Sequence, residues 1–166
     1  RLLNANTNSG SWKELLSAKV SGDRAAVVAR YASATKLEGQ VARGQKLFKK
    51  LCINCHKVQD EGYDVGPKLA SITNKTKEAL LTSIIDPSRA VDASYFNYSI
   101  LTSDGRTFSG KLETETATSI TLLAAEGKRT TVLRDNIDML KASRKSLMPD
   151  GLEQNLELQD VADLIQ

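Results

Sequence analysis

The chain has 166 residues, of which 40% are hydrophobic and 5% aromatic, and its 23 basic and 20 acidic side chains leave a formal net charge of +3. This composition is typical of a globular domain, and the modest, mixed charge argues against a nucleic-acid partner. No apolar run approaches the roughly 20 residues that cross a bilayer, so we expect no membrane span in this chain. Because the chain begins with Arg1, we expect it to be processed or cut from a longer protein.

Helical patterns fill the N-terminal part of the chain. Residues 11–22 begin with a capping box, residues 23–36 are rich in alanine and lack a helix breaker, and residues 37–51 place apolar side chains on one face. Gly44 lies inside the third pattern, where glycine costs roughly 1 kcal/mol relative to alanine. We therefore expect three helices and a close approach of another backbone at Gly44.

A loop and a fourth helix follow. Residues 52–74 contain two glycines and a proline and predict a loop. Residues 75–91 place apolar side chains at helical spacing and predict a helix. This helix must end near Asp86, because Pro87 disfavours helical geometry in the residue before it.

Between about 95 and 133 the sequence becomes rich in Thr, Ser, Ile, Val and Tyr, and helical periodicity disappears. The dipeptides Asp104-Gly105 and Glu126-Gly127 are typical of tight hairpin turns. We therefore predict four short antiparallel strands, which form a small sheet inserted between helical regions.

The C-terminal part begins irregularly and ends in a helix. Residues 134–156 show no clear period and predict an irregular stretch with a short helix. An apolar stripe at helical spacing then predicts a final amphipathic helix. The stripe consists of Leu158, Val161, Ala162 and Ile165.

Both cysteines and the only histidine of the chain fall in the pentapeptide CINCH, as Cys52, Cys55 and His56. C-x-x-C-H is the attachment signature of c-type haem, in which each thiol forms a thioether with a haem vinyl group and the adjacent histidine binds the iron. Two other chemistries stay open. A structural zinc site needs four ligands, of which this cluster supplies three. A thioredoxin-like dithiol expects a strand before it, whereas the preceding segment has a helical pattern.

The sequence after the motif favours haem. An iron-bound imidazole needs an acceptor for its second ring N–H, which orients the ring and raises its basicity. The Gly66-Pro67 segment, ten residues beyond His56, offers backbone carbonyls in a stiff loop. The alternative is that Pro67 only forms a turn.

The second axial ligand follows by elimination. His56 is the only histidine, so two histidines of one chain cannot hold the iron, and methionine is the natural candidate. Met139 lies beside apolar residues and is expected in the core, whereas Met148 precedes Pro149 in a stiff, extended loop. We therefore favour Met148, with Met139, a ligand other than methionine or an open position as alternatives.

These features resemble the class I cytochrome c fold, through the segments GQKLFKKL, CINCH, GPKL and SLMP and the final amphipathic helix. The chain is similar, more closely, to the haem-binding domain of planctomycete and verrucomicrobial proteins. The segments that carry this likeness are DPSRAVDASYFNYSILTSDGRTFSGKLE, TSITLLAAEGKRTTVLRDNID, SLMPDGL and DVADLI. The resemblance runs from about Gly39 to Gln166.

The resemblance implies a mainly α fold with a β insertion. A cytochrome c-like helical core surrounds a covalent haem, and a small antiparallel sheet at about 95–133 interrupts it. Residues 39–166 then form the cytochrome c domain, and residues 1–38 form an N-terminal helical extension. The first and last helices of the domain are expected to cross at Gly44.

The resemblance also implies one covalent haem c with its iron. Cys52 and Cys55 would attach it, His56 and Met148 would be axial ligands, and the Pro67 carbonyl would hold His56. The implied function is electron transfer, not enzymatic catalysis, in a periplasmic or otherwise exported location. The partner is a redox protein or an upstream domain of the same polypeptide. A haem-based sensor or gas-binding module, and a docking domain of a larger dehydrogenase-like protein, are the alternatives.

Overall fold

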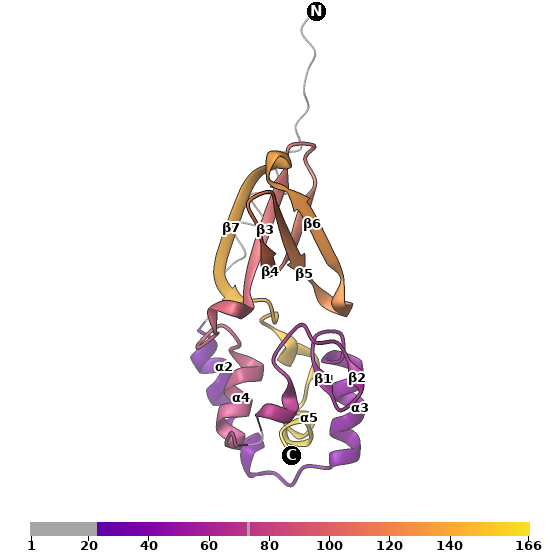
Figure 1. Ribbon diagram of the computed structural model, residues 1–166. Coiled ribbons are helices and arrows are strands. Elements are labelled where there is room, and N and C mark those ends of the chain that lie inside the picture. The colour runs from indigo at the N-terminus through magenta and orange to yellow at the C-terminus, as the bar shows by residue number, and fades with distance from the viewer. Residues whose placement is uncertain (1–22, 73) are drawn as a thin grey trace, which may run out of the picture.

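The computed structural model describes residues 23–72 and 74–166. Helices gather at one end of the molecule and an antiparallel sheet stands at the other (Figure 1). The helices are α2 (Arg24–Tyr31), α3 (Val41–Leu51), α4 (Lys77–Ile85) and α5 (Leu158–Leu164). The helix predicted over residues 11–22 lies outside the described residues. No helix in the described part of the chain is long and apolar enough to cross a membrane.

Local sequence signals explain where these helices begin and end. Asp23 caps α2, and its carboxylate accepts hydrogen bonds from backbone amides of the first turn. The helix continues as the 3-10 turn η1 (Ala32–Lys36). Thr76 caps α4 in the same way, and α4 stops directly before Asp86. The helix end predicted from Pro87 is therefore confirmed.

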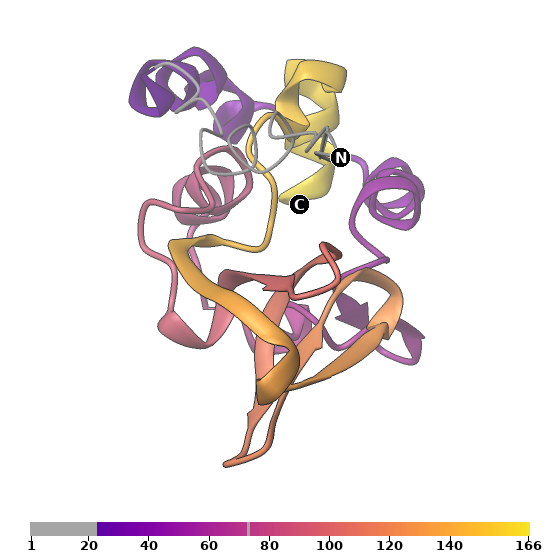
Figure 2. The ribbon, with the colours of Figure 1, turned by 90° about the horizontal axis from the view of Figure 1, so that it is seen from above.

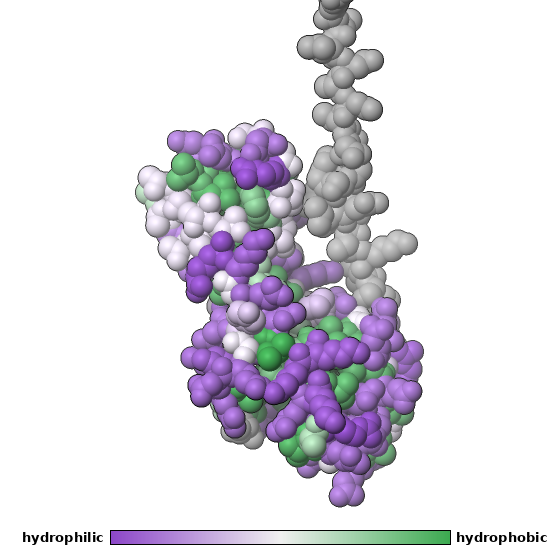
Figure 3. Space-filling model, turned by 90° about the vertical axis from the view of Figure 1, so that its right-hand side faces the viewer, coloured by the Kyte–Doolittle hydropathy of each residue, from purple (hydrophilic) through white to green (hydrophobic). Residues whose placement is uncertain are grey.

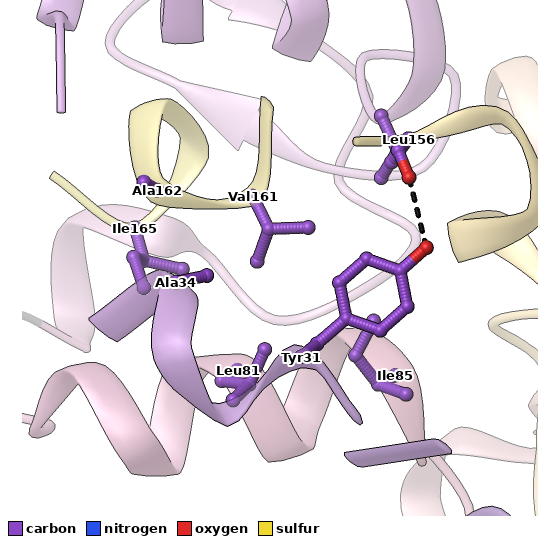
Figure 4. Close-up of a cluster of buried hydrophobic side chains, with 8 residues drawn as sticks. All are labelled: Tyr31, Ala34, Leu81, Ile85, Leu156, Val161, Ala162 and Ile165. Atoms are coloured by element: carbon purple, nitrogen blue, oxygen red, sulfur yellow. Dashed lines mark hydrogen bonds between the residues drawn. The ribbon is translucent and has the colours of Figure 1, made fainter. Parts of the chain in front are cut away.

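One hydrophobic core holds the helical end together (Figure 4). Its buried side chains come from α2, η1, α4, α5 and the two residues that flank α5 closely, Leu156 before its N-cap and Ile165 at its C-cap. The full set is Tyr31, Ala34, Leu81, Ile85, Leu156, Val161, Ala162 and Ile165. Full burial of one large apolar side chain contributes roughly 1.5–3 kcal/mol, so this cluster stabilises the helices strongly. Leu158 is 39% exposed, so the predicted apolar stripe is buried at three of its four positions.

Helix α3 packs against α5, and Figure 2 shows α5 between α3 on one side and α2 and α4 on the other. Gly44 is buried at this crossing, where an added Cβ atom would collide with the carbonyl oxygen of Asp163. The predicted close approach at Gly44 is therefore confirmed. Arg43 reinforces the crossing, because its Nε lies 2.9 Å from Asp163 Oδ2.

The large sheet is antiparallel, with the strand order β6-β5-β4-β3-β7. Its strands are β3 (Phe96–Thr102), β4 (Thr107–Glu115), β5 (Ser119–Leu123), β6 (Arg129–Leu133) and β7 (Ile137–Ser146). The turns at Asp104-Gly105 and Glu126-Gly127 join β3 to β4 and β5 to β6, which confirms both predicted hairpins. The sheet has a core of its own, formed by Ile100, Ile120, Leu122 and Val132.

The expectation of a mainly α fold with a small sheet is wrong. The structure is 39% helical and 28% strand, and the sheet has five strands. The missed strand is β7, which lies where the sequence predicts an irregular stretch with a short helix. β7 pairs with β3 through two register shifts and is exposed over most of its length. Its strand conformation therefore depends on pairing with β3 and not on an apolar pattern of its own.

The expectation that Met139 belongs to the core is also wrong, because this side chain is 42% exposed. Met139 lies in β7, at the edge of the sheet. Figure 3 shows a face covered mostly by polar side chains, with separate apolar patches at the sheet end and the helical end. On this face, apolar side chains form no single continuous surface.

Candidate functional site

The C-x-x-C-H motif continues directly from helix α3. Cys52 is the C-terminal cap of α3, and its N–H donates to the carbonyl of Phe48 at 2.8 Å. The N–H groups of Cys55 and His56 then both donate to the Cys52 carbonyl, at 3.1 and 2.9 Å. The motif is therefore a compact turn at the end of α3, which keeps both thiols and the imidazole close to this helix end.

The loop after the motif folds back onto it. Between them lies a small hairpin of β1 (Lys57–Val58) and β2 (Glu61–Gly62). The N–H of Tyr63 donates to the carbonyl of Ile53 at 3.2 Å. The Cys55 carbonyl accepts from Val65 at 3.1 Å and from Gly66 at 2.7 Å. Because these bonds must break before the motif can open, the loop holds the motif firmly.

The sheet also contacts the motif, at the turn between β5 and β6. The N–H of Glu126 donates to the carbonyl of Asn54, between the two cysteines, at 2.7 Å. A Cβ atom on Gly127 would lie 3.2 Å from the ring of Tyr63, so the turn sits against this ring. Glu126 adopts a φ of 60°, which residues other than glycine rarely do. The sheet therefore touches the loop that would carry a cofactor.

The His56 imidazole hydrogen-bonds to the same loop. Its Nδ1 lies 2.9 Å from the carbonyl oxygen of Pro67. A carbonyl oxygen can only accept, so Nδ1 carries a proton, and in the neutral imidazole Nε2 keeps its lone pair. Gly66 packs against the ring, because a Cβ atom there would lie only 2.6 Å from His56 Cε1. The ring is thus oriented as in metal-binding histidines, with Nε2 available.

The two thiols are free and half-buried. Burial raises the pKa of Cys52 to about 11, with a further contribution from the nearby Cys55. Burial also raises the pKa of Cys55. Reactive dithiols instead have lowered pKa values, because the thiolate is the nucleophile. This environment argues against the dithiol alternative.

A zinc site finds no support in the part of the chain that the structure describes. No three His, Cys, Asp or Glu side chains of that part come together as metal ligands. A structural zinc ion needs four such ligands. The described residues therefore do not offer the ligand set that zinc requires.

Met148 lies on a separate segment, between β7 and α5. Its N–H donates to Ser146 Oγ at 3.1 Å, and the N–H of Leu147 donates to the carbonyl of Tyr95 at 3.0 Å. The Met148 side chain is half-buried. The predicted iron ligands thus come from two different segments, and the role of Met148 stays a prediction.

Two contacts, one with the motif and one on the segment after Met148, were not foreseen from the sequence. One is the bond from Glu126 to Asn54, and the other is an ion pair between Arg24 and Glu153. The Glu126-Gly127 dipeptide predicts a turn but not what the turn touches. The ion pair joins residues 129 positions apart, so no local pattern could have found it.

The residues present fit a covalently bound haem. Two thiols separated by two residues, followed by an imidazole with a free Nε2, form the donor set of c-type haem. Half-buried apolar side chains of α3 and α4 also pack beside the helical core and keep part of their apolar surface exposed, the kind of surface that a porphyrin packs against. They are Leu47, Leu51, Leu80 and Ile84.

Comparison with known proteins agrees with this donor set. A scan against protein-family models matches residues 41–166 to the family described as Cytochrome c. A search of the curated proteins found no match. The family match begins at the first residue of α3, so α2 lies outside it. The chain therefore belongs to the cytochrome c family, whose members bind haem c covalently, with its iron, and serve in electron transfer.

Proposed function

We propose that this chain is an electron-transfer domain whose single haem c has His56 and Met148 as axial ligands. The observation that carries the proposal is the 2.9 Å contact between His56 Nδ1 and the Pro67 carbonyl oxygen, which leaves Nε2 for the iron. Met148 is the proposed second ligand because the chain has no second histidine. In addition, Pro149 stiffens the loop that carries the methionine.

When bound, haem c supplies one-electron chemistry, as its iron alternates between the ferric and ferrous states. Cys52 and Cys55 would each add an S–H group across a haem vinyl group, which gives two thioether bonds. His56 would bind through Nε2 while its Nδ1–H stays on the Pro67 carbonyl. Met148 would offer a neutral thioether, which raises the reduction potential. A rigid site with two neutral ligands favours electron transfer over ligand exchange.

We infer that residues 39–166 form the cytochrome c domain and that residues 1–38 form an N-terminal helical extension. The likeness to planctomycete and verrucomicrobial haem-binding domains supports a role within a larger oxidoreductase. Electrons would then pass between the haem and an upstream domain of the same polypeptide or a separate redox protein. Because c-type haem is attached outside the bacterial inner membrane, we place the domain in the periplasm or an equivalent exported location.

The first test is an absorption spectrum of the protein, produced in a host that attaches haem c and extracted with acid acetone. We expect retained haem, a low-spin reduced spectrum and a sulfur-to-iron band in the oxidised form. Replacing both Cys52 and Cys55 with serine should abolish haem retention. Met148→Ala should remove the sulfur-to-iron band while the haem stays attached.

Met139→Ala is the control for the methionine assignment, because Met139 is the second of the chain's two methionines and lies exposed in β7. Its spectrum should equal that of the unchanged protein. A band that persists in Met148→Ala but disappears in Met139→Ala would reassign the ligand. Binding of carbon monoxide to the reduced protein within seconds would contradict a closed site and favour the sensor alternative.

A further inference from the structure

Helix α2 lies outside the segment that matches the cytochrome c family, yet it contacts the chain just after Met148. Arg24 donates two hydrogen bonds to the carboxylate of Glu153, at 2.8 and 2.9 Å. Glu153 belongs to the 3-10 turn η6 (Leu152–Asn155). The two side chains are only 12% and 3% exposed. Because water screens this pair little, it is stronger than an ion pair on the surface.

Tyr31, at the other end of α2, contacts the same segment. Its hydroxyl oxygen lies 2.9 Å from the carbonyl oxygen of Glu153 and 2.8 Å from that of Leu156. Figure 4 shows the second of these contacts, with the Tyr31 ring buried in the core. Two residues near opposite ends of α2 therefore hold the segment between Glu153 and Leu156.

The Arg24 guanidinium also connects this segment to helix α4. Its Nε donates to the carbonyl of Ile85, the last residue of α4, at 3.1 Å. The hydrogen bond from Arg24 holds the pKa of Glu153 below its usual value and outweighs the opposing effect of burial. The carboxylate is therefore charged at neutral pH and remains bound to Arg24.

The chain before Met148 is held by different contacts. The N–H of Ser146 donates to Ser88 Oγ at 3.2 Å, and the N–H of Leu147 donates to the Tyr95 carbonyl at 3.0 Å. Met148 thus lies between an upstream anchor at the base of the sheet and a downstream anchor on α2. A segment held at both ends has fewer conformations, so a residue on it leaves its position less readily.

We propose that Arg24 and Tyr31 are positioning residues for Met148, and that helix α2 thereby favours the methionine sulfur over competing ligands of the iron. This inference rests on the proposed axial role of Met148. Helix α2, which the family match does not include, would then help to keep the Met148 sulfur on the iron. Weakening the contacts of α2 should therefore change the sixth ligand before it unfolds the domain.

The test uses the full chain with haem attached and measures the affinity of the ferric form for imidazole, which competes with methionine for the iron. Tyr31→Phe keeps the ring in the core and should tighten imidazole binding about threefold to tenfold, the equivalent of one neutral hydrogen bond. Arg24→Gln leaves the Glu153 carboxylate without its charged partner and should tighten binding on the order of a hundredfold. Arg24→Lys keeps the positive charge but loses the planar guanidinium. Its imidazole affinity should lie between those of Tyr31→Phe and Arg24→Gln.

Arg43→Gln is the matched control, because it also removes an arginine from a buried carboxylate, that of Asp163 between α3 and α5. It should lower the overall stability without changing the imidazole affinity. Equal effects of Arg24→Gln and Arg43→Gln on that affinity would overturn the inference and leave the axial role of Met148 intact. An unchanged imidazole affinity in Tyr31→Phe would also overturn the inference. If Arg24→Gln does not fold, the result for Tyr31→Phe is the deciding one. A sulfur-to-iron band missing from the unchanged protein would instead contradict the axial role itself.

Discussion

His56 is held by contacts close to it in the sequence, whereas Met148 lies between anchors from distant parts of the chain. On the histidine side, Nδ1 of His56 meets the Pro67 carbonyl 11 residues later. On the methionine side, Glu153 meets Arg24 across 129 residues. Local contacts form at little cost in loop-closure entropy, but distant contacts require the rest of the fold to be in place.

This difference predicts how the two sides respond to damage. Conditions that weaken tertiary packing should release the methionine side first, because its anchors depend on α2, α4 and the sheet together. The histidine side should persist, because most of its contacts belong to one turn and one loop. Substitutions in the helix packing, on the histidine side and on the methionine side can test this difference.

Gly44→Val should have the largest effect, because it disrupts the packing of α3 against α5 at the helical end of the molecule. The new side chain would collide with the Asp163 carbonyl, where α3 meets α5. We expect the free energy of unfolding to fall by about 3 kcal/mol or more, measured by urea titration. Ala42→Val, at an exposed position of α3, should cost only about 0.5 kcal/mol through helix propensity. Similar losses in both variants would show that the crossing is not tight.

Gly66→Ala should act on the histidine side alone. The added methyl group would lie 2.6 Å from His56 Cε1, so the ring or the loop must move. We expect a loss of about 1–3 kcal/mol in the free energy of unfolding, together with a shifted imidazole resonance in nitrogen NMR.

Gly105→Ala is the control for that substitution. Gly105 has a φ of 83° and no neighbouring atom within 4 Å of an added Cβ, so alanine there costs only backbone strain, about 1 kcal/mol. The imidazole resonance should stay in place. If Gly66→Ala also leaves that resonance in place, the ring does not depend on Gly66 for its position.

Acidification should lower the stability of the methionine side, because it protonates Glu153. The pKa of Glu153 is lower in the folded protein, chiefly through its hydrogen bond from Arg24, so the folded state binds fewer protons than the unfolded chain. The stability that Glu153 provides is complete above the ordinary carboxyl pKa, which the unfolded chain keeps, and is lost as the pH falls through the lower pKa of the folded state. Urea titrations between about pH 7 and pH 3 should show this loss. Glu153→Gln should be less stable at neutral pH and should lose less on acidification, and an equally steep loss would contradict the assignment.

Glu126→Gly should have the smallest effect, and it should be stabilising. Glu126 has a φ of 60°, which costs an ordinary residue about 1–2 kcal/mol. Glycine removes that strain at a smaller entropic cost, so we expect a gain of about 0.5 kcal/mol in thermal unfolding. The amide at this position should still exchange slowly with deuterium, because it donates to the Asn54 carbonyl. Lys128→Gly, at a φ of −67°, should instead destabilise by about 0.5–1 kcal/mol.

Much of the fold could be predicted from short stretches of sequence. Pro87 predicts the end of α4, and Asp104-Gly105 predicts the first hairpin, because both act on backbone geometry within one or two residues. Strand β7 could not be predicted in this way. Its side chains are mostly exposed, and its pairing with β3 contains two register shifts, so no apolar alternation marks it. The share of sheet in the fold was underestimated for that reason.

In the candidate site, too, local features could be predicted from the sequence and contacts between distant residues could not. Cys52, Cys55 and His56 could be found because they lie at the C-x-x-C-H spacing along the chain. A carbonyl acceptor for His56 could be expected from the stiff loop around Pro67. The neighbours of Glu126 and Arg24 could not be found. Glu126 contacts Asn54 in the C-x-x-C-H turn, and Arg24 contacts Glu153 in η6, and both partners lie far away in the sequence.

By itself, the sequence determined the motif, the end of α4 and the hairpin turns at Asp104-Gly105 and Glu126-Gly127. Those features depend on backbone preferences and spacings that act over a few residues. Only the tertiary structure decided that β7 completes the sheet, that Met139 lies exposed and that α2 holds the segment after Met148. These outcomes depend on which distant surfaces pack together, and that choice is set by the free energy of the whole fold.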